Sequence, residues 1–346
     1  MSRIQTVSLG IGLAFLALVA RVEVARADFL YVANLGTQSA PAPSIDVYTV
    51  SPLALKSSLP IGQFPARGLL VVGNTLYATA SSNEVLRFAI DPATGLLTPG
   101  KGVTARNDPR GMAAEGATLF VANHGTNSLG VYAINVASGA LKLAQTVTGV
   151  AGADQLAIID TSPRILVSSG TDVCTFAIGG TLKLLRCSPS SHQAGQPASS
   201  VASLGKEVYF TQYTVTGFGT LTGVGAFDVK PATGLIVPRG PSIPYGVIPL
   251  YGLAASPRDR VVYLARSVGI STLSAATATS FSEVAFLQMP AVPATLVADP
   301  KRKIVYAASP IQNQIFSIDF SSAPPTITPV AGSAGGFPLS LGLLSQ

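Results

Sequence analysis

The chain has 346 residues, of which 48% are hydrophobic and only 11% are charged, with a formal net charge of +6. This composition, with 34 glycines and 25 prolines, is typical of a folded, turn-rich protein and excludes an intrinsically disordered one. Because the lysines and arginines form no cluster, the sequence does not indicate a nucleic-acid-binding surface. Two cysteines and two histidines make no ligand set, so neither a metal nor another cofactor is expected.

Residues 1–27 have the layout of a secretory signal peptide. Met1-Ser2-Arg3 gives a basic start, residues 11–20 are an apolar run, and Ala25-Arg26-Ala27 is an A-x-A cleavage site. The apolar run is shorter than a membrane-spanning helix needs, although it also suits a buried N-terminal helix. We therefore expect a protein that is periplasmic or secreted, with a mature domain over residues 28–346 and no membrane span after the leader is removed.

From residue 28 onwards, one short apolar strand recurs seven times at a mean spacing of about 46 residues, close to the period of propeller blades. The copies begin at Leu30, Leu76, Leu119, Ile165, Val208, Val262 and Val305. A second strand and a hairpin follow each copy. The clearest hairpin turn is Asp91-Pro92-Ala93-Thr94-Gly95, in which proline sets φ early and glycine takes the left-handed position.

A further short strand precedes every copy except the first. The missing one has a match at the C-terminus, Pro338-Leu339-Ser340-Leu341, where it can supply the innermost strand of the first blade and remove the open sheet edge. The sequence therefore predicts an all-β, seven-bladed propeller of four-stranded blades, closed by its C-terminal strand and expected to be a monomer. Residues 39–44 and 213–223 are expected as longer loops, and 238–249 as a proline-rich link.

Cys174 and Cys187 flank a hairpin whose turn is Gly179-Gly180. Pairing around that turn sets residue 174 opposite 185, which places Cys187 one diagonal step away on the same face. A small change of register or a bulge would bring the two cysteines opposite each other. A local disulfide and two unpaired thiols both remain open.

The first residues of the innermost strands are expected to form a ring around the central channel. Arg67 and Arg110 could hold a carboxylate or phosphate, and Asp154 could act as a general base. Ser199 and Tyr251 could donate hydrogen bonds to a carbonyl oxygen. The alternative is that Arg110 and Asp154, on adjacent blades, form a structural ion pair. His124 and His192 are assigned to surface turns and loops; the ring residues are Arg67, Arg110, Asp154, Ser199, Tyr251, Ala294 and Leu339.

Two segments, Tyr31-Val32-Ala33-Asn34 and Phe120-Val121-Ala122-Asn123, resemble YVTN-type propeller repeats. Residues 28–346 also resemble the seven-bladed β-propeller lactonase family, which includes bacterial 6-phosphogluconolactonases. That resemblance implies the propeller fold and lactone hydrolysis. The family often opens an inner strand with Gly-Pro-Arg-His; here Asp108-Pro109-Arg110-Gly111 keeps the arginine but replaces the expected acid–base histidine by Gly111.

Two functions follow from these observations. The first is an exported lactonase-like hydrolase in which Arg67 and Arg110 bind a small anionic lactone or sugar acid and Asp154 activates water. The second is a non-catalytic propeller that presents its loops to a protein, glycan or cell-envelope partner. The fold serves both functions, the arginine pair favours the first, and the missing histidine favours the second.

Overall fold

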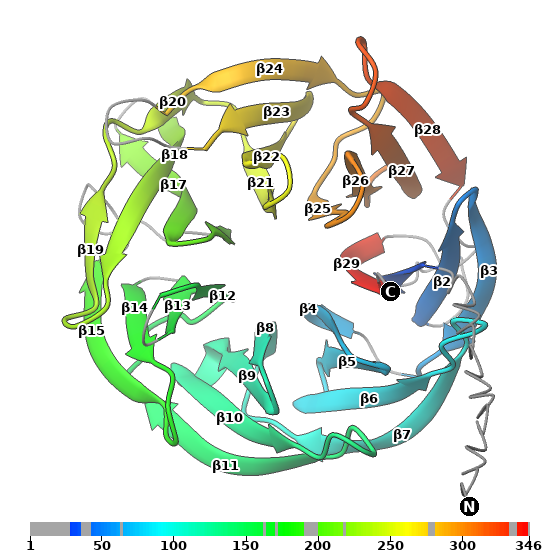
Figure 1. The fold of residues 1–346 in the computed structure, drawn as a ribbon, viewed down its shortest axis with the longest axis vertical. Coiled ribbons are helices and arrows are strands. Elements are labelled where there is room, and N and C mark those ends of the chain that lie inside the picture. The colour runs from blue at the N-terminus through cyan, green and yellow to red at the C-terminus, as the bar shows by residue number, and fades with distance from the viewer. Residues whose placement is uncertain are drawn as a thin grey trace, which may run out of the picture.

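The computed structural model describes residues 28–35, 43–62, 65–161, 164–169, 172–189, 200–216, 219–275, 281–331 and 338–344. The expected signal peptide, residues 1–27, lies outside this part of the chain. Over the described residues, seven antiparallel sheets are arranged in a ring like the blades of a propeller (Figure 1). The predicted all-β, seven-bladed fold is confirmed. The helical segment within the described ranges is one 3₁₀ turn, η1 (His124–Thr126).

The first four blades follow the chain from the channel outwards, apart from the innermost strand of blade one. Blade one consists of β29 (Pro338–Leu344), β1 (Phe29–Asn34), β2 (Ser44–Val50) and β3 (Leu53–Pro60). Blade two consists of β4 (Pro65–Val72), β5 (Thr75–Ala80), β6 (Glu84–Ile90) and β7 (Leu97–Thr104). Blade three consists of β8 (Pro109–Glu115), β9 (Thr118–Asn123), β10 (Ser128–Ile134) and β11 (Leu141–Thr148). Blade four consists of β12 (Gln155–Ile159), β13 (Ile165–Ser169), β14 (Asp172–Ala177) and β15 (Lys183–Pro189).

The last three blades continue the same order. Blade five consists of β16 (Val201–Leu204), β17 (Glu207–Thr216), β18 (Gly219–Lys230) and β19 (Leu235–Pro238), with β20 (Ile243–Gly246) also paired to β18. Blade six consists of β21 (Leu250–Ser256), β22 (Val261–Arg266), β23 (Gly269–Ser274) and β24 (Glu283–Gln288). Blade seven consists of β25 (Thr295–Ala298), β26 (Ile304–Ser309), β27 (Gln314–Asp319) and β28 (Thr326–Ala331).

The ring closes between the two ends of the chain, as the sequence predicts. Strand β29 pairs antiparallel with β1, and Phe29 lies opposite Leu344. This pairing gives blade one its innermost strand and covers the edge that β1 would otherwise expose.

Blade five differs from the sequence prediction. The stretch 213–223, expected as a loop, lengthens a hairpin instead, because β17 and β18 stay paired out to Thr216 and Gly219. Part of the expected proline-rich link also forms a strand, since β20 pairs with β18 through Val224 and Ile243. Threonine-rich sequence suits a strand well, so the extra residues extend the sheet rather than leave it.

The second strand of each blade explains why the repeat is so apolar. Leu30, Tyr31 and Val32 on β1 are fully buried, and the matching residues of β5, β9, β22 and β26 are buried in the same way. Neighbouring blades cover both faces of these strands, so their sequence is continuously hydrophobic rather than alternating. The outermost strands, such as β3, are largely exposed.

Hydrogen bonds between side chains and turns connect neighbouring blades. The hydroxyl group of Tyr31 donates to the carbonyl oxygen of Gly95 at 3.1 Å, and that of Tyr77 donates to Gly139 at 2.7 Å. Both glycines have positive φ, which confirms the left-handed position predicted for Gly95. Tyr31 and Tyr77 are thereby held to the hairpin turn of the next blade.

The two cysteines lie opposite each other on β14 and β15. The turn at Gly179-Gly180 alone would leave them in diagonal positions, but a β-bulge between Thr175 and Phe176 shifts the register. The structure joins Cys174 and Cys187 by a disulfide with an S–S distance of 2.03 Å. It connects the third strand of blade four to its outermost strand.

Candidate functional site

The innermost strands of all seven blades lie around the centre of the ring (Figure 1). They line a cavity of about 650 Å³ in the central channel. Its side chains are uncharged and mixed in polarity. The lining residues are Gly68, Leu69, Gly111, Met112, Gln155, Ser200, Val201, Pro249, Leu250, Tyr251, Gly252, Leu253, Ala294, Thr295, Leu296, Ser340 and Leu341. We call this cavity the polar half of the channel.

The expected ring residues lie at or next to this cavity. Tyr251 and Ala294 line it. Arg110 and Asp154 directly precede Gly111 and Gln155, which line it. Ser199 and His192 lie outside the described residues, as do the side chains of Arg67 and Leu339. The residues that face the cavity are therefore mostly one position later in each strand than the ring that the repeat alignment predicts.

Glycines in this ring allow neighbouring inner strands to approach closely. A Cβ atom on Gly111 would lie 2.5 Å from the carbonyl oxygen of Asp154 and 2.8 Å from the Cα of Gln155. The amide of Gly111 donates a hydrogen bond to that same carbonyl at 2.8 Å. The position at which the lactonase family often has its histidine therefore has no room for a side chain here, because the next blade occupies the space.

Arg110 is held between two carboxylates beside the cavity. Its Nε donates to Asp108 Oδ2 at 3.0 Å, its Nη2 lies 2.8 Å from the same oxygen, and its Nη1 donates to Asp154 Oδ1 at 3.2 Å. Burial lowers the pKa of the Arg110 guanidinium, but the hydrogen bonds and charges of Asp108 and Asp154 raise it by more. The ion pair between Arg110 and Asp154, considered from the sequence as the alternative to catalysis, is present.

His124 joins this arrangement through Asp108. Its Nδ1 lies 3.3 Å from Asp108 Oδ2, and its backbone N–H donates to the Asp108 carbonyl at 2.9 Å. Asp108 has a φ of +53°, and its own N–H donates to Asn83 Oδ1 at 3.1 Å, so several contacts fix this turn. A neutral imidazole that carries its proton on Nδ1 has its lone pair on Nε2.

We call Asp108, Arg110, His124 and Asp154 the mouth cluster, because they lie where β8 and β12 begin, next to the polar half of the channel. From the sequence, His124 was expected in a surface turn, and Asp108 was given no role in the site. The missed signal was the hairpin register: Pro109 pairs with Asn123, so the residues just outside that pair, 108 and 124, must be neighbours. His124 and Asp108 remain half-exposed, whereas Arg110 and Asp154 are mostly buried.

A second cavity, of about 290 Å³, lies farther along the inner strands. It shares Leu69 and Leu341 with the polar half, but every residue that lines it is apolar. These residues are Leu69, Leu70, Val71, Ala255, Pro257, Val297, Ala298, Pro300, Leu341, Gly342 and Leu343. We call it the apolar half of the channel.

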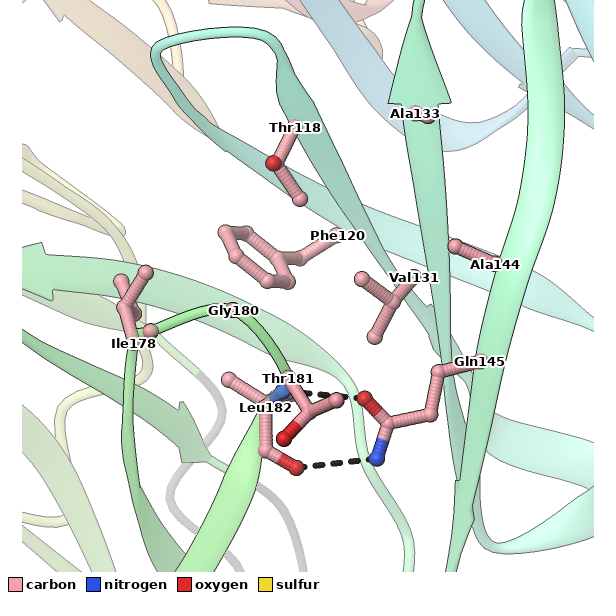
Figure 2. A pocket seen from close by; sticks show the side chains of 11 residues that line it. Thr118, Phe120, Val131, Ala133, Ala144, Gln145, Ile178, Gly180, Thr181 and Leu182 are labelled. Atoms are coloured by element: carbon pink, nitrogen blue, oxygen red, sulfur yellow. Dashed lines mark hydrogen bonds between the residues drawn. The ribbon is translucent and has the colours of Figure 1, made fainter.

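A third cavity, of about 190 Å³, lies away from the channel, between blades three and four. Figure 2 shows Phe120 and Val131 at this cavity, and Gln145 bonded to Leu182 of blade four. Both amide atoms of Gln145 bond to the backbone of Leu182, each at 2.9 Å. None of its lining residues is ionisable, so we interpret this cavity as a gap in blade packing and not as a reaction site.

Within the described ranges, no three His, Cys, Asp or Glu side chains lie close enough together to hold a metal ion. Among these same residues, no helix is long and apolar enough to cross a membrane.

Comparison with known proteins agrees with the family resemblance. The family model described as "Lactonase, 7-bladed beta-propeller" matches residues 14–155, which is less than half of the chain. All four residues of the mouth cluster lie inside the matched segment. The resemblance to this family is therefore confirmed over the first three blades. No curated protein matches the sequence.

Several solved structures share the fold at low sequence identity. Periplasmic gluconolactonase PpgL of Pseudomonas aeruginosa is 14% identical, with 92% of this chain and 99% of that chain covered and a TM-score of 0.72. A protein from Lactobacillus plantarum is 12% identical, with coverages of 92% and 100% and a TM-score of 0.71. Hydrazine synthase of Kuenenia stuttgartiensis is 16% identical, with coverages of 80% and 90% and a TM-score of 0.65. At these identities the likeness shows the fold alone, and proteins of different function share it.

Proposed function

We propose that this protein is an exported hydrolase that opens a small, uncharged lactone at the mouth of its central channel. The observation that carries the proposal is the mouth cluster, in which His124, Asp108 and Arg110 are joined beside a cavity of about 650 Å³ with a lining of mixed polarity. The match to the lactonase family model over residues 14–155 supports the same reaction class.

The charges of the mouth cluster favour a neutral substrate. Asp108 and Asp154 together carry two negative charges against the single positive charge of Arg110, and the cavity lining is uncharged. An anionic lactone or sugar acid, as expected from the sequence, would meet no net positive charge among these described side chains. A neutral ring rich in oxygen atoms would instead find hydroxyl and amide groups on Ser200, Thr295 and Gln155.

His124 is the best-placed acid–base group of the cluster. Asp108 Oδ2 lies 3.3 Å from Nδ1 and would stabilise the imidazolium by its charge, so Nε2 could take a proton from water while the water oxygen attacks the carbonyl carbon. The ring C–O bond then breaks, the leaving oxygen receives the proton from Nε2, and a hydroxy acid is released. Asp154, proposed from the sequence as the base, has its Oδ1 bound to Arg110 and would serve to orient that side chain.

Arg110 could stabilise the negative charge that develops on the carbonyl oxygen. Its guanidinium has five N–H donors, of which the contacts to Asp108 and Asp154 engage three. The remaining two could donate to the substrate oxygen, which gains charge in the transition state.

Export is part of the proposal and rests on the N-terminal sequence. The first residue expected after cleavage, Asp28, has a place in the folded ring: its carboxylate pairs with Arg302 at 3.1 Å. N-terminal sequencing of the protein from a periplasmic or medium fraction should begin at Asp28. Recovery of the chain from the cytoplasm alone, with Met1 or Ser2 first, would contradict export.

The test is hydrolysis of neutral and anionic lactones by the purified protein. Glucono-δ-lactone should be turned over faster than a lactone that carries a carboxylate. His124→Gln and Asp108→Asn should each lower kcat/KM by about 100-fold, the usual size of a general acid–base contribution. Arg164→Ala is the control, because it breaks an exposed ion pair with Glu115 away from the mouth.

A wild-type rate no higher than the uncatalysed rate on every lactone would refute the hydrolase. The non-catalytic propeller that binds a protein, glycan or envelope partner through its loops would then be the function to test.

A further inference from the structure

The central channel changes character along its length. Its polar half and its apolar half meet at Leu69 and Leu341, which line both cavities. The polar half presents Gln155, Ser200 and Thr295 among apolar residues such as Leu253 and Leu296, whereas the apolar half presents only aliphatic side chains, prolines and a glycine. A ligand that extends through both halves would therefore be polar at one end and apolar at the other.

The inner strands set the direction of this change. Along β4 the lining passes from Gly68 in the polar half to Val71 in the apolar half, and along β29 it passes from Ser340 to Leu343. At a rise of about 3.3 Å per strand residue, either path is about 10 Å long. This length suits a linear alkyl chain that continues from a small ring.

We propose that the ligand of this channel is an amphipathic lactone, with its ring in the polar half and a linear alkyl chain in the apolar half. This inference rests on the proposed lactone-opening function and adds the substrate class. Val71, Val297 and Leu343 contact the chain, and the mouth cluster stays beside the ring.

Burial of the alkyl chain predicts how the affinity should change with its length. Transfer of one methylene from water to an apolar environment is worth about 0.8 kcal/mol, which corresponds to about fourfold in affinity. A purely polar site would show no such dependence, because added methylenes would remain in water. The affinity should therefore rise with chain length until the apolar half is filled.

The experiment measures the affinity of the full protein for γ-butyrolactone, γ-octalactone and γ-dodecalactone by calorimetry. We expect γ-dodecalactone to bind at least tenfold more tightly than γ-octalactone, and γ-butyrolactone to bind most weakly. An n-alkanol of matched length tests whether the ring contributes, and it should bind more weakly than the lactone.

Two double variants test where the alkyl chain of the lactone binds. Val71→Thr combined with Val297→Thr keeps the shape of both side chains but puts hydroxyls into the apolar half. It should weaken the binding of γ-dodecalactone about tenfold and leave the binding of γ-butyrolactone unchanged. The matched control, Val136→Thr with Val284→Thr, makes the same change at exposed positions outside the channel and should affect neither ligand. Unchanged γ-butyrolactone binding also reports that the variants are folded.

The outcomes separate this inference from the proposed function. Equal affinities for all three lactones, with glucono-δ-lactone still hydrolysed, would overturn the amphipathic ligand and leave the hydrolase intact. Chain-length-dependent binding without hydrolysis of any lactone would refute the hydrolase but support the apolar half. Chain-length dependence that persists in the Val71/Val297 variant would overturn the assigned position of the chain.

Discussion

Blades three and four are joined by an ion pair at each end of the channel, and the two pairs differ in burial. At the start of β8, Arg110 bonds to Asp154, and their side chains are 19% and 13% exposed. At the end of the same strand, Glu115 bonds to Arg164 at 3.1 Å, with exposures of 31% and 47%. Breaking a buried pair leaves one charge without its partner where water solvates it poorly. The charge left by breaking an exposed pair is solvated by water instead.

The comparison shows that two similar contacts between the same blades can serve different purposes. The exposed pair adds little to stability and constrains little. The buried pair holds Arg110 in one orientation. Asp108 accepts a hydrogen bond from Arg110 and also lies beside His124. We therefore expect perturbations at the mouth to change both stability and turnover, and perturbations at the other end to change neither by much.

Arg110→Ala should produce the largest effect. It leaves Asp154 mostly buried without the guanidinium, so the free energy of unfolding should fall by about 3 kcal/mol. It also removes the donors proposed to stabilise the carbonyl oxygen, so kcat/KM should fall at least about 100-fold. Urea unfolding and lactone kinetics measure the two effects. A stable variant with wild-type turnover would show that the mouth cluster is neither a structural nor a catalytic feature.

Gly111→Ala should have the next largest effect. Its Cβ would lie 2.5 Å from a backbone oxygen of the neighbouring blade, so the strands must separate, with a loss of about 2 kcal/mol in stability. Gly180→Ala is the control for replacing a glycine without a steric contact, because a Cβ there meets no atom within 4 Å. If Gly111→Ala were no more destabilising than Gly180→Ala, close approach of β8 and β12 would not be required.

Double-mutant cycles compare the two pairs directly. The coupling energy between Arg110 and Asp154 should exceed about 1 kcal/mol, and that between Arg164 and Glu115 should stay below about 0.5 kcal/mol. Alanine variants of all four residues and thermal or urea unfolding provide the values. Equal coupling energies would mean that burial does not distinguish the pairs.

Arg164→Ala alone should have the smallest effect, below about 1 kcal/mol, with kcat/KM unchanged. High salt should remove even this difference, because it screens exposed charges. Unfolding at low and high sodium chloride concentration tests the expectation. A destabilisation that persists at high salt would instead indicate lost packing of the arginine stem.

The sequence predicted the propeller fold because the fold is built from a repeated unit. Seven copies of an apolar strand, the orphan strand at 338–341 and the left-handed Gly95 each follow from local patterns that β-propeller geometry imposes. The site was only partly predictable. Arg110 and Asp154 were identified as neighbours because the repeat aligns them, but His124 was not, because its partner Asp108 is reached only through hairpin register.

The remaining differences arise where tertiary contacts override local signals. A glycine- and threonine-rich stretch was predicted as a loop, but β18 pairs on both sides and remains a strand. The cysteines lie opposite each other only because of a bulge at Thr175, which sequence spacing does not reveal. A shift of about one residue in the residues facing the channel likewise depends on how neighbouring inner strands pack.

The pairing of β29 with β1 also bears on how the molecule unfolds. In an open array of repeats, the terminal repeats can fray one at a time, because stability is a sum over nearest neighbours. Here Phe29 faces Leu344, so blade one has a neighbour on both sides and its own sheet joins the most distant parts of the domain. The contact is slow to form, since a very long loop must close first. Once it has formed, no blade is terminal, and unfolding is expected to be cooperative across the whole ring.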